Sequence, residues 1–229
     1  LGCSYCILQS YLSEPGLRVF SNIEEGLEGV LSTVDSAPNR IFRVGTGEFT
    51  DSLALDPLTR WSDLLVPKFS ARKNAILELK TKTDRIEGLL RLPFRDRIVI
   101  SWSLNSPHVA AREEHGAPSV RKRLEAASRC QREGFVVAFH FDPLICHPRW
   151  HEGYQRAVDL LGRYINPHRV IWISLGSLRF MPELKALIRK NHPDSRILDG
   201  EFVRGLDGKM RYFRPIRTGL YASLASNLR

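Results

Sequence analysis

The sequence lacks a membrane-spanning segment and a secretory signal. A spanning helix needs about 20 consecutive apolar residues, and no apolar run in this 229-residue chain is that long. Four cysteines are too few for a disulfide scaffold in a chain of this size. These absences favour a cytoplasmic protein with one α/β domain over residues 1–229. Because the chain begins at Leu1 rather than at a methionine, we expect the true N-terminus to lie elsewhere.

Acidic residues are in the minority. The chain has 25 Asp and Glu against 34 Lys and Arg, which gives a formal net charge of +9. This excess favours a polyanionic partner such as nucleic acid, because bound phosphates release counterions. A merely basic enzyme is the alternative. The basic residues form no long run and cluster only at residues 121–123 and 211–217.

The chain also lacks internal repeats, low-complexity tracts and linkers. Short β-rich apolar runs instead alternate with helical patterns, which predicts a parallel sheet, either doubly wound or closed as a barrel. The predicted strands are 40–44, 75–81, 97–102, 135–141 and 170–175. The predicted helices are 22–34, one capped by Asp84, one capped by Ser119, 150–164, and one with Pro182 in its first turn. The stretch 58–74 is ambiguous, because Pro67 interrupts a helical pattern.

Each predicted strand is apolar early and polar late. Alternate positions share one face of a strand, so in a barrel these polar groups would meet at the carboxyl mouth, where such barrels hold their chemistry. The sequence therefore predicts a site at this mouth. The groups are Gly45, Thr46, Gly47 and Glu48; Glu78, Lys80 and Lys82; Ser101, Ser103 and Asn105; His140 and Asp142; Ser174, Gly176 and Arg179.

Cys3 and Cys6 form a C-x-x-C motif at the start of the chain. Such a pair occurs as a redox dithiol, as half of a zinc site, or in an iron–sulfur site. No second C-x-x-C is present to complete a four-cysteine zinc site. The cysteine spacing alone does not decide between the remaining readings.

Several segments resemble the spore photoproduct lyase family, a branch of the radical S-adenosylmethionine (SAM) enzymes, and the resemblance covers essentially the whole chain. They are residues 6–9, 50–51, 56–59, 81–82, 103–106, 143–154 and 179–180. The superfamily motif is C-x-x-x-C-x-x-C, so Cys3 and Cys6 would be its second and third cysteines. The first cysteine is then expected two positions upstream of Leu1.

The resemblance implies a fold and cofactors. The expected fold is a partial (β/α)6-type radical SAM barrel with parallel strands, here lacking its N-terminal strand. Three thiolates would hold a [4Fe–4S] cluster, whose open iron binds SAM. Reduction, by a partner such as flavodoxin or ferredoxin, cleaves SAM to a 5′-deoxyadenosyl radical that abstracts hydrogen from the substrate. For this family the implied substrate is damaged DNA, and more broadly nucleic acid or a nucleotide.

The resemblance also implies roles for individual residues. Glu48 would meet the SAM ammonium beside glycines that let the backbone approach closely. Lys82 would meet the SAM carboxylate, and Tyr5 matches the tyrosine before the last cluster cysteine. The implied SAM contacts are Gly45, Gly47, Glu48, Lys82, Ser103 and Asn105, and the implied metal ligands are Cys3 and Cys6.

The sequence departs from the family in its hydrogen-return machinery. Glu48 stands where the family has its hydrogen-donor cysteine, and Ile7 stands where it has a second tyrosine. A carboxylic acid cannot replace a thiol, because its O–H bond is too strong to release a hydrogen atom readily. We therefore expect retained SAM cleavage with a different substrate or a different radical quench. Cys146 is a candidate donor, against the alternative of a loop cysteine without a role, and Cys130 reads as structural.

Two further features leave alternatives open. His140 and Asp142 replace apolar family positions and could supply acid–base or substrate contacts, although a lone histidine at a strand end is more often only hydrogen-bonded. His147 matches a family histidine of unassigned role. The basic and aromatic residues within 211–217 suit nucleic acid, or belong to a C-terminal segment, about 205–229, that covers the barrel. Rival functions are a radical SAM enzyme for a small molecule or peptide, and a non-catalytic nucleic-acid-binding barrel with a structural cluster.

Overall fold

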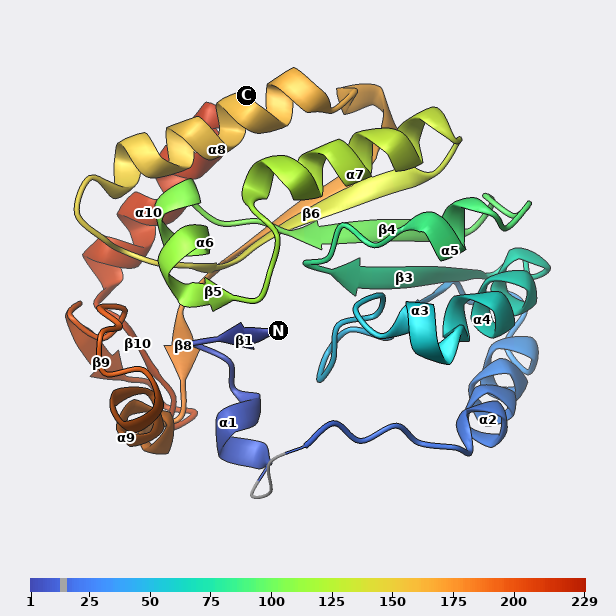
Figure 1. Ribbon diagram of the computed structural model, residues 1–229, viewed down its shortest axis with the longest axis horizontal. Helices are drawn as coiled ribbons and strands as arrows, with labels where there is room; N and C mark the ends of the chain where they lie inside the picture. Colours follow the sequence, from blue (N-terminus) through green and yellow to red (C-terminus); the bar gives the residue numbers. More distant parts are fainter. Residues whose placement is uncertain (13–15) are drawn as a thin grey trace.

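The computed structural model describes residues 1–12 and 16–229. Its centre is a five-stranded parallel sheet in the order β2-β3-β4-β6-β7, curled into a half-barrel (Figure 1). The strands are β2 (Phe42–Gly45), β3 (Ala75–Thr81), β4 (Ile98–Ser103), β6 (Val136–Leu144) and β7 (Val170–Ser177). All five predicted strands and the partial-barrel fold are confirmed.

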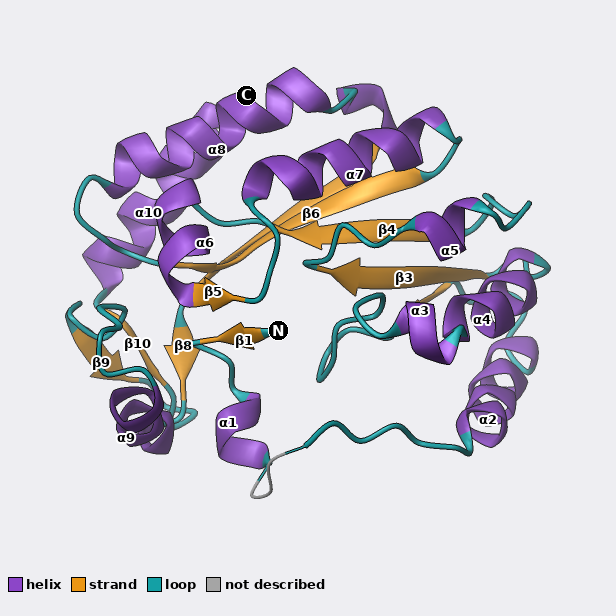
Figure 2. Ribbon diagram, in the orientation of Figure 1, coloured by secondary structure: helices purple, strands orange, loops and turns teal. Residues whose placement is uncertain are grey.

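The helices between residues 23 and 169 lie around this sheet, as Figure 2 shows. They are α2 (Ile23–Asp35), α3 (Asp56–Thr59), α4 (Trp61–Ser70), α5 (Glu87–Leu90), α6 (Pro107–Glu113), α7 (Val120–Arg132), α8 (Trp150–Tyr164) and the 3-10 turn η1 (Pro167–Arg169). Helix α7 contacts β4 and β6, and α4 contacts β3. None of the helices described is both long and apolar enough to cross a membrane.

The alternation along the strands explains the two faces of the sheet. In β3, Leu77 and Leu79 are buried in the hydrophobic core beside helix residues such as Phe69 and Leu124. Full burial of each such side chain contributes about 1.5–3 kcal/mol. Glu78 and Lys80, which alternate with these leucines, therefore project from the opposite, concave face. The helices thus bury one face and leave the polar one lining the inside of the half-barrel.

Helix ends agree with the sequence predictions in three cases. Ser119 caps α7, where its hydroxyl accepts from the amide of Lys122 at 3.3 Å. Pro182 is the first residue of α9 (Pro182–Asn191), and α8 has the predicted bounds. These caps satisfy or remove amide donors that would otherwise lack a partner.

Two details of the helix predictions are wrong. Asp84 does not cap α5: the N-cap is Ile86, and no side chain caps this helix. Pro67 lies inside α4 without ending it, and the break in 58–74 falls at Arg60, which has a φ of 52°. Asp56 stabilises this break, because its carboxylate accepts from the amide of Ser62 at 2.8 Å and from its hydroxyl at 2.6 Å.

Two small antiparallel sheets complete the described fold. Strand β1 (Gly2–Cys3) pairs with β5 (Glu114–His115) and leads into the short helix α1 (Leu8–Tyr11). The second sheet has the order β8-β10-β9, with β8 (Arg179–Phe180), β9 (Phe202–Arg204) and β10 (Met210–Tyr212). The segment 205–229 contains β10 and α10 (Arg214–Asn227), and α10 packs against α8 and β7.

Candidate active site at the carboxyl end of the half-barrel

The C-x-x-C loop lies at the carboxyl end of the sheet. In Figure 1 the arrowheads of β3 and β4 point toward β1, which carries Cys3. The loop closes as a tight turn, because the amide of Cys6 donates to the carbonyl of Cys3 at 3.0 Å. Gln9 fixes the turn from inside, donating to the carbonyls of Ser4 and Cys6 at 2.8 and 3.2 Å.

The donor set suits part of an iron–sulfur site. Cys3 is buried and Cys6 is half-buried, and both thiols are unpaired by any disulfide. Within residues 1–12 and 16–229, no group of three or more His, Cys, Asp or Glu side chains is placed to hold a metal ion. The two soft thiol ligands therefore fit two of the three positions that a three-cysteine cluster motif requires.

Lys82 lies beside this loop. Its Nζ is 5.8 Å from the centre of the Tyr5 ring. Burial raises the pKa of the Cys3 thiol, and the positive charge of Lys82 opposes that rise. The predicted SAM-carboxylate residue and the cluster loop are thus neighbours, although β3 and β1 are far apart in sequence.

Asp51 positions Lys82, a role that the strand pattern did not reveal. One carboxylate oxygen accepts from the amide of Lys82 at 2.7 Å, and the other accepts from the hydroxyl of Thr81 at 2.6 Å. The second oxygen also accepts from the amides of Leu53 and Ala54. This single carboxylate therefore joins the loop after β2 to the end of β3. In the sequence, only the place of Asp51 in the family-like segment 50–51 pointed to such a role.

The glycines after β2 are explained by packing against β3. A Cβ on Gly47 would lie 2.7 Å from the Cβ of Lys80, closer than side chains approach one another, whereas a Cβ on Gly45 would find an ordinary contact. Only Gly47 is therefore required by this close approach. Glu48 follows in an exposed position, and no hydrogen bond or ion pair of its side chain occurs within the described residues. The structure does not bring Glu48 into contact with Lys82 or Ser103.

Ser103 ends β4 and is linked to Tyr5 through a buried ion pair. The guanidinium of Arg123 donates to the carbonyl of Ser103 at 2.9 Å and pairs with Glu114 at 2.5 Å. Glu114 in turn accepts from the Tyr5 hydroxyl. Burial, reinforced by the negative charge of Glu114, raises the pKa of Tyr5 well above its ordinary value, so the phenol stays protonated at neutral pH.

Asn105 is engaged by its neighbours. Its amide nitrogen donates to the carbonyl of Pro143 at 2.9 Å, and its carbonyl oxygen accepts from the Tyr154 hydroxyl at 2.8 Å. Ser106 bonds to the Nε2 of His147 at 2.9 Å. These contacts indicate that Asn105 positions the two loops and does not contact a cofactor directly. The bond from Ser106 gives His147, the histidine that matches the family, a partner inside the protein.

His140 shares the concave face with Asp142, as predicted, but it lies deeper and is buried. Its Nε2 is 2.7 Å from Glu78, and its Nδ1 is 2.5 Å from the hydroxyl of Ser174. Arg43 donates to the other oxygen of Glu78 at 2.8 Å and stacks on Trp172 at 4.2 Å. Both ring nitrogens of His140 are therefore occupied within the protein.

Glu78 is the charged centre of this network. Burial alone would raise the pKa of its carboxyl, but hydrogen bonds, led by that from His140 and including that from Arg43, lower the pKa from 4.5 to about 2. Glu78 is thus ionised at every pH at which the protein would work. The sequence placed Glu78 at the mouth without identifying its partner 62 residues away.

Asp142 and Lys80 occupy the next level toward the mouth. The carboxyl carbon of Asp142 lies against Gly176, where a Cβ would approach it to 2.6 Å, so this glycine leaves room for the carboxylate. Burial lowers the pKa of Lys80, while the negative charge of Asp142 opposes the change. The concave face therefore holds charges of both signs close to Lys82.

Cys146 lies in the loop after β6, beside the small β8-β10-β9 sheet. Its amide donates to the Tyr212 hydroxyl at 3.1 Å. Burial raises the pKa of its thiol, which keeps the S–H bond intact at neutral pH, as a hydrogen-atom donor requires. No hydrogen bond joins Cys146 to Tyr5 or Lys82 in the described part of the chain.

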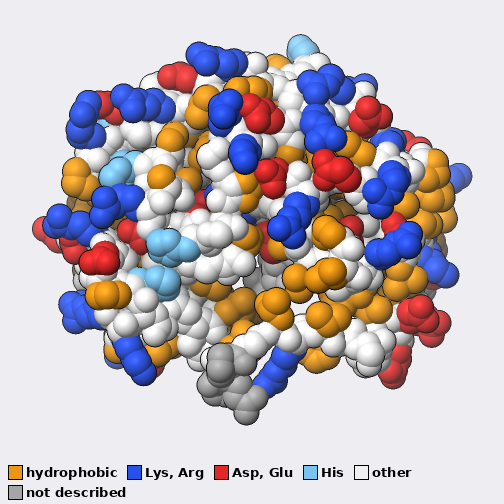
Figure 3. Space-filling model, viewed as in Figure 1, with side chains coloured by type: hydrophobic (Ala, Val, Ile, Leu, Met, Phe, Trp, Pro, Cys, Tyr) orange, Lys and Arg blue, Asp and Glu red, His pale blue; other side chains and the backbone are white. Residues whose placement is uncertain are grey.

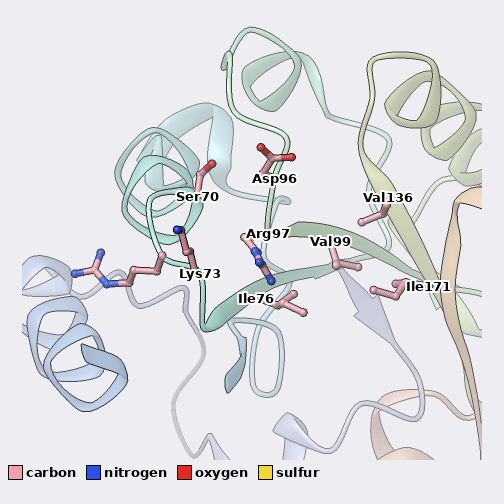
Figure 4. A pocket seen from close by; sticks show the side chains of 9 residues that line it. Ser70, Lys73, Ile76, Asp96, Arg97, Val99, Val136 and Ile171 are labelled. Carbon is pink, nitrogen blue, oxygen red and sulfur yellow. The ribbon is translucent and has the colours of Figure 1, made fainter. Parts of the chain in front are cut away.

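A cavity lies at the opposite end of the half-barrel. It measures about 540 Å³ and opens at the amino ends of the strands, as Figure 4 shows. Its lining includes Lys73, Ile76, Arg97 and Val136. In (β/α) barrels this end serves stability and the carboxyl end holds the chemistry, so we place the site at the mouth and not in this cavity.

The face in Figure 3 carries Lys and Arg interspersed with Asp and Glu, without a single basic patch. Arg211, predicted to suit nucleic acid, forms an ion pair with Asp207. A surface arginine already paired to a carboxylate has less to offer a phosphate.

The sequence is similar to a family of known proteins over most of its length. The sequence model of the spore photoproduct lyase family matches residues 1–213. Spore photoproduct lyase of Bacillus subtilis (strain 168) is 28% identical over 204 residues, covering 87% of this chain and 59% of the relative. The enzyme of Geobacillus sp. (strain Y412MC61) is 25% identical over 198 residues, covering 85% of this chain and 58% of the relative. The chain thus spans less than two thirds of the length of these relatives.

Solved structures agree with the fold. A spore photoproduct lyase double mutant with bound AdoMet and dinucleoside spore photoproduct matches 99% of this chain and 69% of its own, with a TM-score of 0.91 at 24% identity. A spore photoproduct lyase complexed with the dinucleoside photoproduct matches the same shares with a TM-score of 0.90. At this identity the likeness establishes the half-barrel architecture.

Proposed function

This chain belongs to the spore photoproduct lyase family, and on that premise we propose that it is the barrel of a radical SAM enzyme, a lyase-like enzyme of the DNA-repair type acting on nucleic acid or a nucleotide. The observation that carries the proposal is the meeting of the C-x-x-C loop, Lys82 and Ser103 at one end of the sheet, joined through Tyr5, Glu114 and Arg123. Relatives of the same fold bind AdoMet and a dinucleoside photoproduct.

The cofactor residues follow from this arrangement. Cys3 and Cys6 would hold two irons of a [4Fe–4S] cluster, and the family motif assigns the remaining thiolate to a cysteine two positions before Leu1. When bound, the cluster and SAM supply a 5′-deoxyadenosyl radical by reductive cleavage. The source of the electron would be a reductant such as flavodoxin or ferredoxin in the cytoplasm.

The protein residues bind and orient SAM. Lys82 would pair with the carboxylate of SAM, and its backbone is fixed for this task by Asp51. Ser103 would contact SAM at the end of β4. Glu48 would reach the SAM ammonium from the exposed loop after Gly47, and Gly45 and Asn105 would shape the two loops around it.

The hydrogen-return step would differ from that of the family. Glu48 occupies the position of the donor cysteine and Ile7 that of the second tyrosine. We infer that the substrate radical receives its hydrogen atom from another group, and Cys146 is the candidate thiol. Tyr5 would lie next to the site at which the radical forms. Asp142 would contact the substrate inside the half-barrel through its carboxylate, whereas His140, whose ring nitrogens are both occupied, would contact it only through its ring carbons.

A second candidate substrate is a small polar molecule or a peptide. The network of Glu78, His140 and Ser174, joined by the exposed Arg43, supports it, because His140 and Asp142 stand where the family resemblance gives apolar residues. Salt-sensitive DNA binding would favour nucleic acid, and its absence would favour the small substrate. A non-catalytic barrel with a structural cluster would bind DNA without cleaving SAM.

The test uses the full-length protein, reconstituted with iron and sulfide without oxygen and reduced with dithionite. We expect 5′-deoxyadenosine and methionine to form from SAM, and Lys82→Ala to weaken SAM affinity about tenfold or more, the loss of one charge-assisted contact. Lys68→Ala, at an exposed position on α4, is the control and should match the wild type. Failure of the reconstituted wild type to form any 5′-deoxyadenosine would rule out the catalytic proposals.

A further inference from the structure

Both residues between the two cysteines are held by consecutive carboxylates. The Ser4 hydroxyl donates to Glu113, and the Tyr5 hydroxyl donates to Glu114. The backbone adds a third bond, from the amide of Ser4 to the carbonyl of Glu113 at 2.8 Å. We call Glu113 and Glu114 the carboxylate clamp.

The clamp is buried and its charges have definite partners. Glu113 and Glu114 are only 5% and 3% exposed. Ser195 also donates to Glu113, at 2.7 Å, and Glu114 pairs at 2.5 Å with Arg123, whose side chain is fully buried. Burying an ion pair costs desolvation energy that hydrophobic residues of the same volume would avoid. Such a pair is therefore weak as a stability device, and its geometry points to another role.

Arg123 connects the clamp to the predicted SAM site. Its three donor nitrogens are all used: one pairs with Glu114, one donates to the carbonyl of Ser103 at 2.9 Å, and one donates to the carbonyl of Pro118 at 2.9 Å. A planar guanidinium fixes its partners in direction as well as in distance. The C-x-x-C loop and the end of β4 are thus held in one frame by a single side chain.

We propose that Glu114 and Arg123 are positioning residues that preform the C-x-x-C loop and set its distance from Ser103, with Glu113 holding the other residue of the loop. The pair also keeps a buried negative charge next to the cysteines, on the Tyr5 side. This inference rests on the proposed function only for its consequence at the cluster. The preformed loop belongs to the chain itself, and it is testable without metal.

The first test measures amide hydrogen exchange in the metal-free protein. The amide of Cys6 donates to the carbonyl of Cys3 within the loop, and the amide of Ser4 donates to the carbonyl of Glu113 in the clamp. In Glu114→Gln, which leaves Arg123 without its counter-charge, we expect these two amides to exchange about tenfold faster, since an opening free energy lower by 1.4 kcal/mol has that effect. The matched control is Asp56→Asn, another buried carboxylate, whose hydrogen bonds among the described residues go only to Ser62, and it should leave the loop amides unchanged.

A second variant covers the case in which Glu114→Gln does not fold. Tyr5→Phe removes one hydrogen bond of the clamp and leaves the Glu114–Arg123 pair intact. It should speed exchange at Ser4 and Cys6 alone, and by a smaller factor. Faster exchange over the whole chain, or none at these amides, would overturn the positioning role.

The third readout is the reduction potential of the reconstituted cluster, measured by a dye-mediated titration with spectroscopic detection. Glu114→Gln removes a buried negative charge and should shift the potential upward, whereas Asp56→Asn should not. A merely structural role would not move this quantity, so an unchanged potential would also refute the proposal. If the wild type forms no 5′-deoxyadenosine, the proposed function fails, while the exchange measurements still decide on the clamp.

Discussion

At the scale of single residues, Asp51 positions the proposed SAM-binding residue Lys82 through hydrogen bonds, without a required contact to SAM itself. Its two oxygens accept four hydrogen bonds, from Lys82, Thr81, Leu53 and Ala54. A buried or half-buried donor that loses its acceptor carries a desolvation penalty of about 1–3 kcal/mol. Removing Asp51 therefore releases the backbone of Lys82 as well as the loop after β2.

We predict that Asp51→Ala weakens SAM binding about tenfold by displacing Lys82, a change of 1.4 kcal/mol. Isothermal titration calorimetry on the reconstituted protein measures this directly. The matched control is Asp84→Ala, two residues beyond Lys82, because no hydrogen bond of the Asp84 side chain is found among the described residues. Equal dissociation constants for Asp51→Ala and the wild type would contradict the positioning of Lys82.

Glu78 gives the stability a defined dependence on acid pH. Its pKa is about 2 in the folded protein against an ordinary 4.5, so the folded state binds this proton more weakly than the unfolded state. The stabilisation is complete above pH 4.5 and disappears as the pH falls through 2. We predict that the free energy of unfolding falls on the order of 2 kcal/mol more between pH 5 and pH 2.5 in the wild type than in Glu78→Gln. Urea unfolding at both pH values tests this, and parallel pH profiles would contradict it.

The sequence predicted which residues face the mouth but not how they pair. His140 and Glu78 were both placed there by their alternation along strands, yet their contact spans 62 residues and depends on the order of strands in the sheet. Asp142 needed Gly176 opposite it for room, which no local pattern records. The alternation of residues along one strand predicts which face of the sheet a side chain lies on. Which side chains it meets on the neighbouring strands depends on how the strands are paired and in what register.

At the scale of elements, strands were easier to predict than helix starts. A buried parallel strand reads as an apolar run whatever its neighbours, whereas a cap depends on one hydrogen bond. Ser119 makes that bond to the amide of Lys122. Asp84 does not, because Ile86 is the N-cap and the preceding turn is closed by Thr83, whose hydroxyl accepts from the amide of Arg85 at 3.2 Å.

We predict that Ser119→Ala lowers the free energy of unfolding by about 1 kcal/mol, the usual value of an N-cap bond. Asp84→Ala should change it by less than about 0.5 kcal/mol, as expected for a surface substitution without such a bond. Chemical denaturation followed by circular dichroism measures both. A larger loss for Asp84→Ala than for Ser119→Ala would show that α5 is capped as the sequence first suggested.

At the scale of the whole molecule, net charge was a poor guide to where a polyanion would bind. Several arginines already pair with carboxylates of the chain itself, at the surface in Arg72–Asp35 and Arg129–Glu87 and in the interior in Arg123–Glu114. The net charge of +9 therefore predicts a positive overall electrostatic potential. It does not predict where on the surface a polyanion would bind. The proposal of a nucleic-acid substrate therefore rests on the family match over residues 1–213 and not on the charge.

The central claim is that this half-barrel generates a 5′-deoxyadenosyl radical and uses it on nucleic acid. The most direct measurement incubates the reduced, reconstituted full-length protein with SAM and deuterated, ultraviolet-irradiated DNA, and analyses the 5′-deoxyadenosine by mass spectrometry. The account predicts deuterium in the product, because the abstracted atom comes from the DNA. Product that forms at the same rate without DNA and never carries deuterium would contradict it.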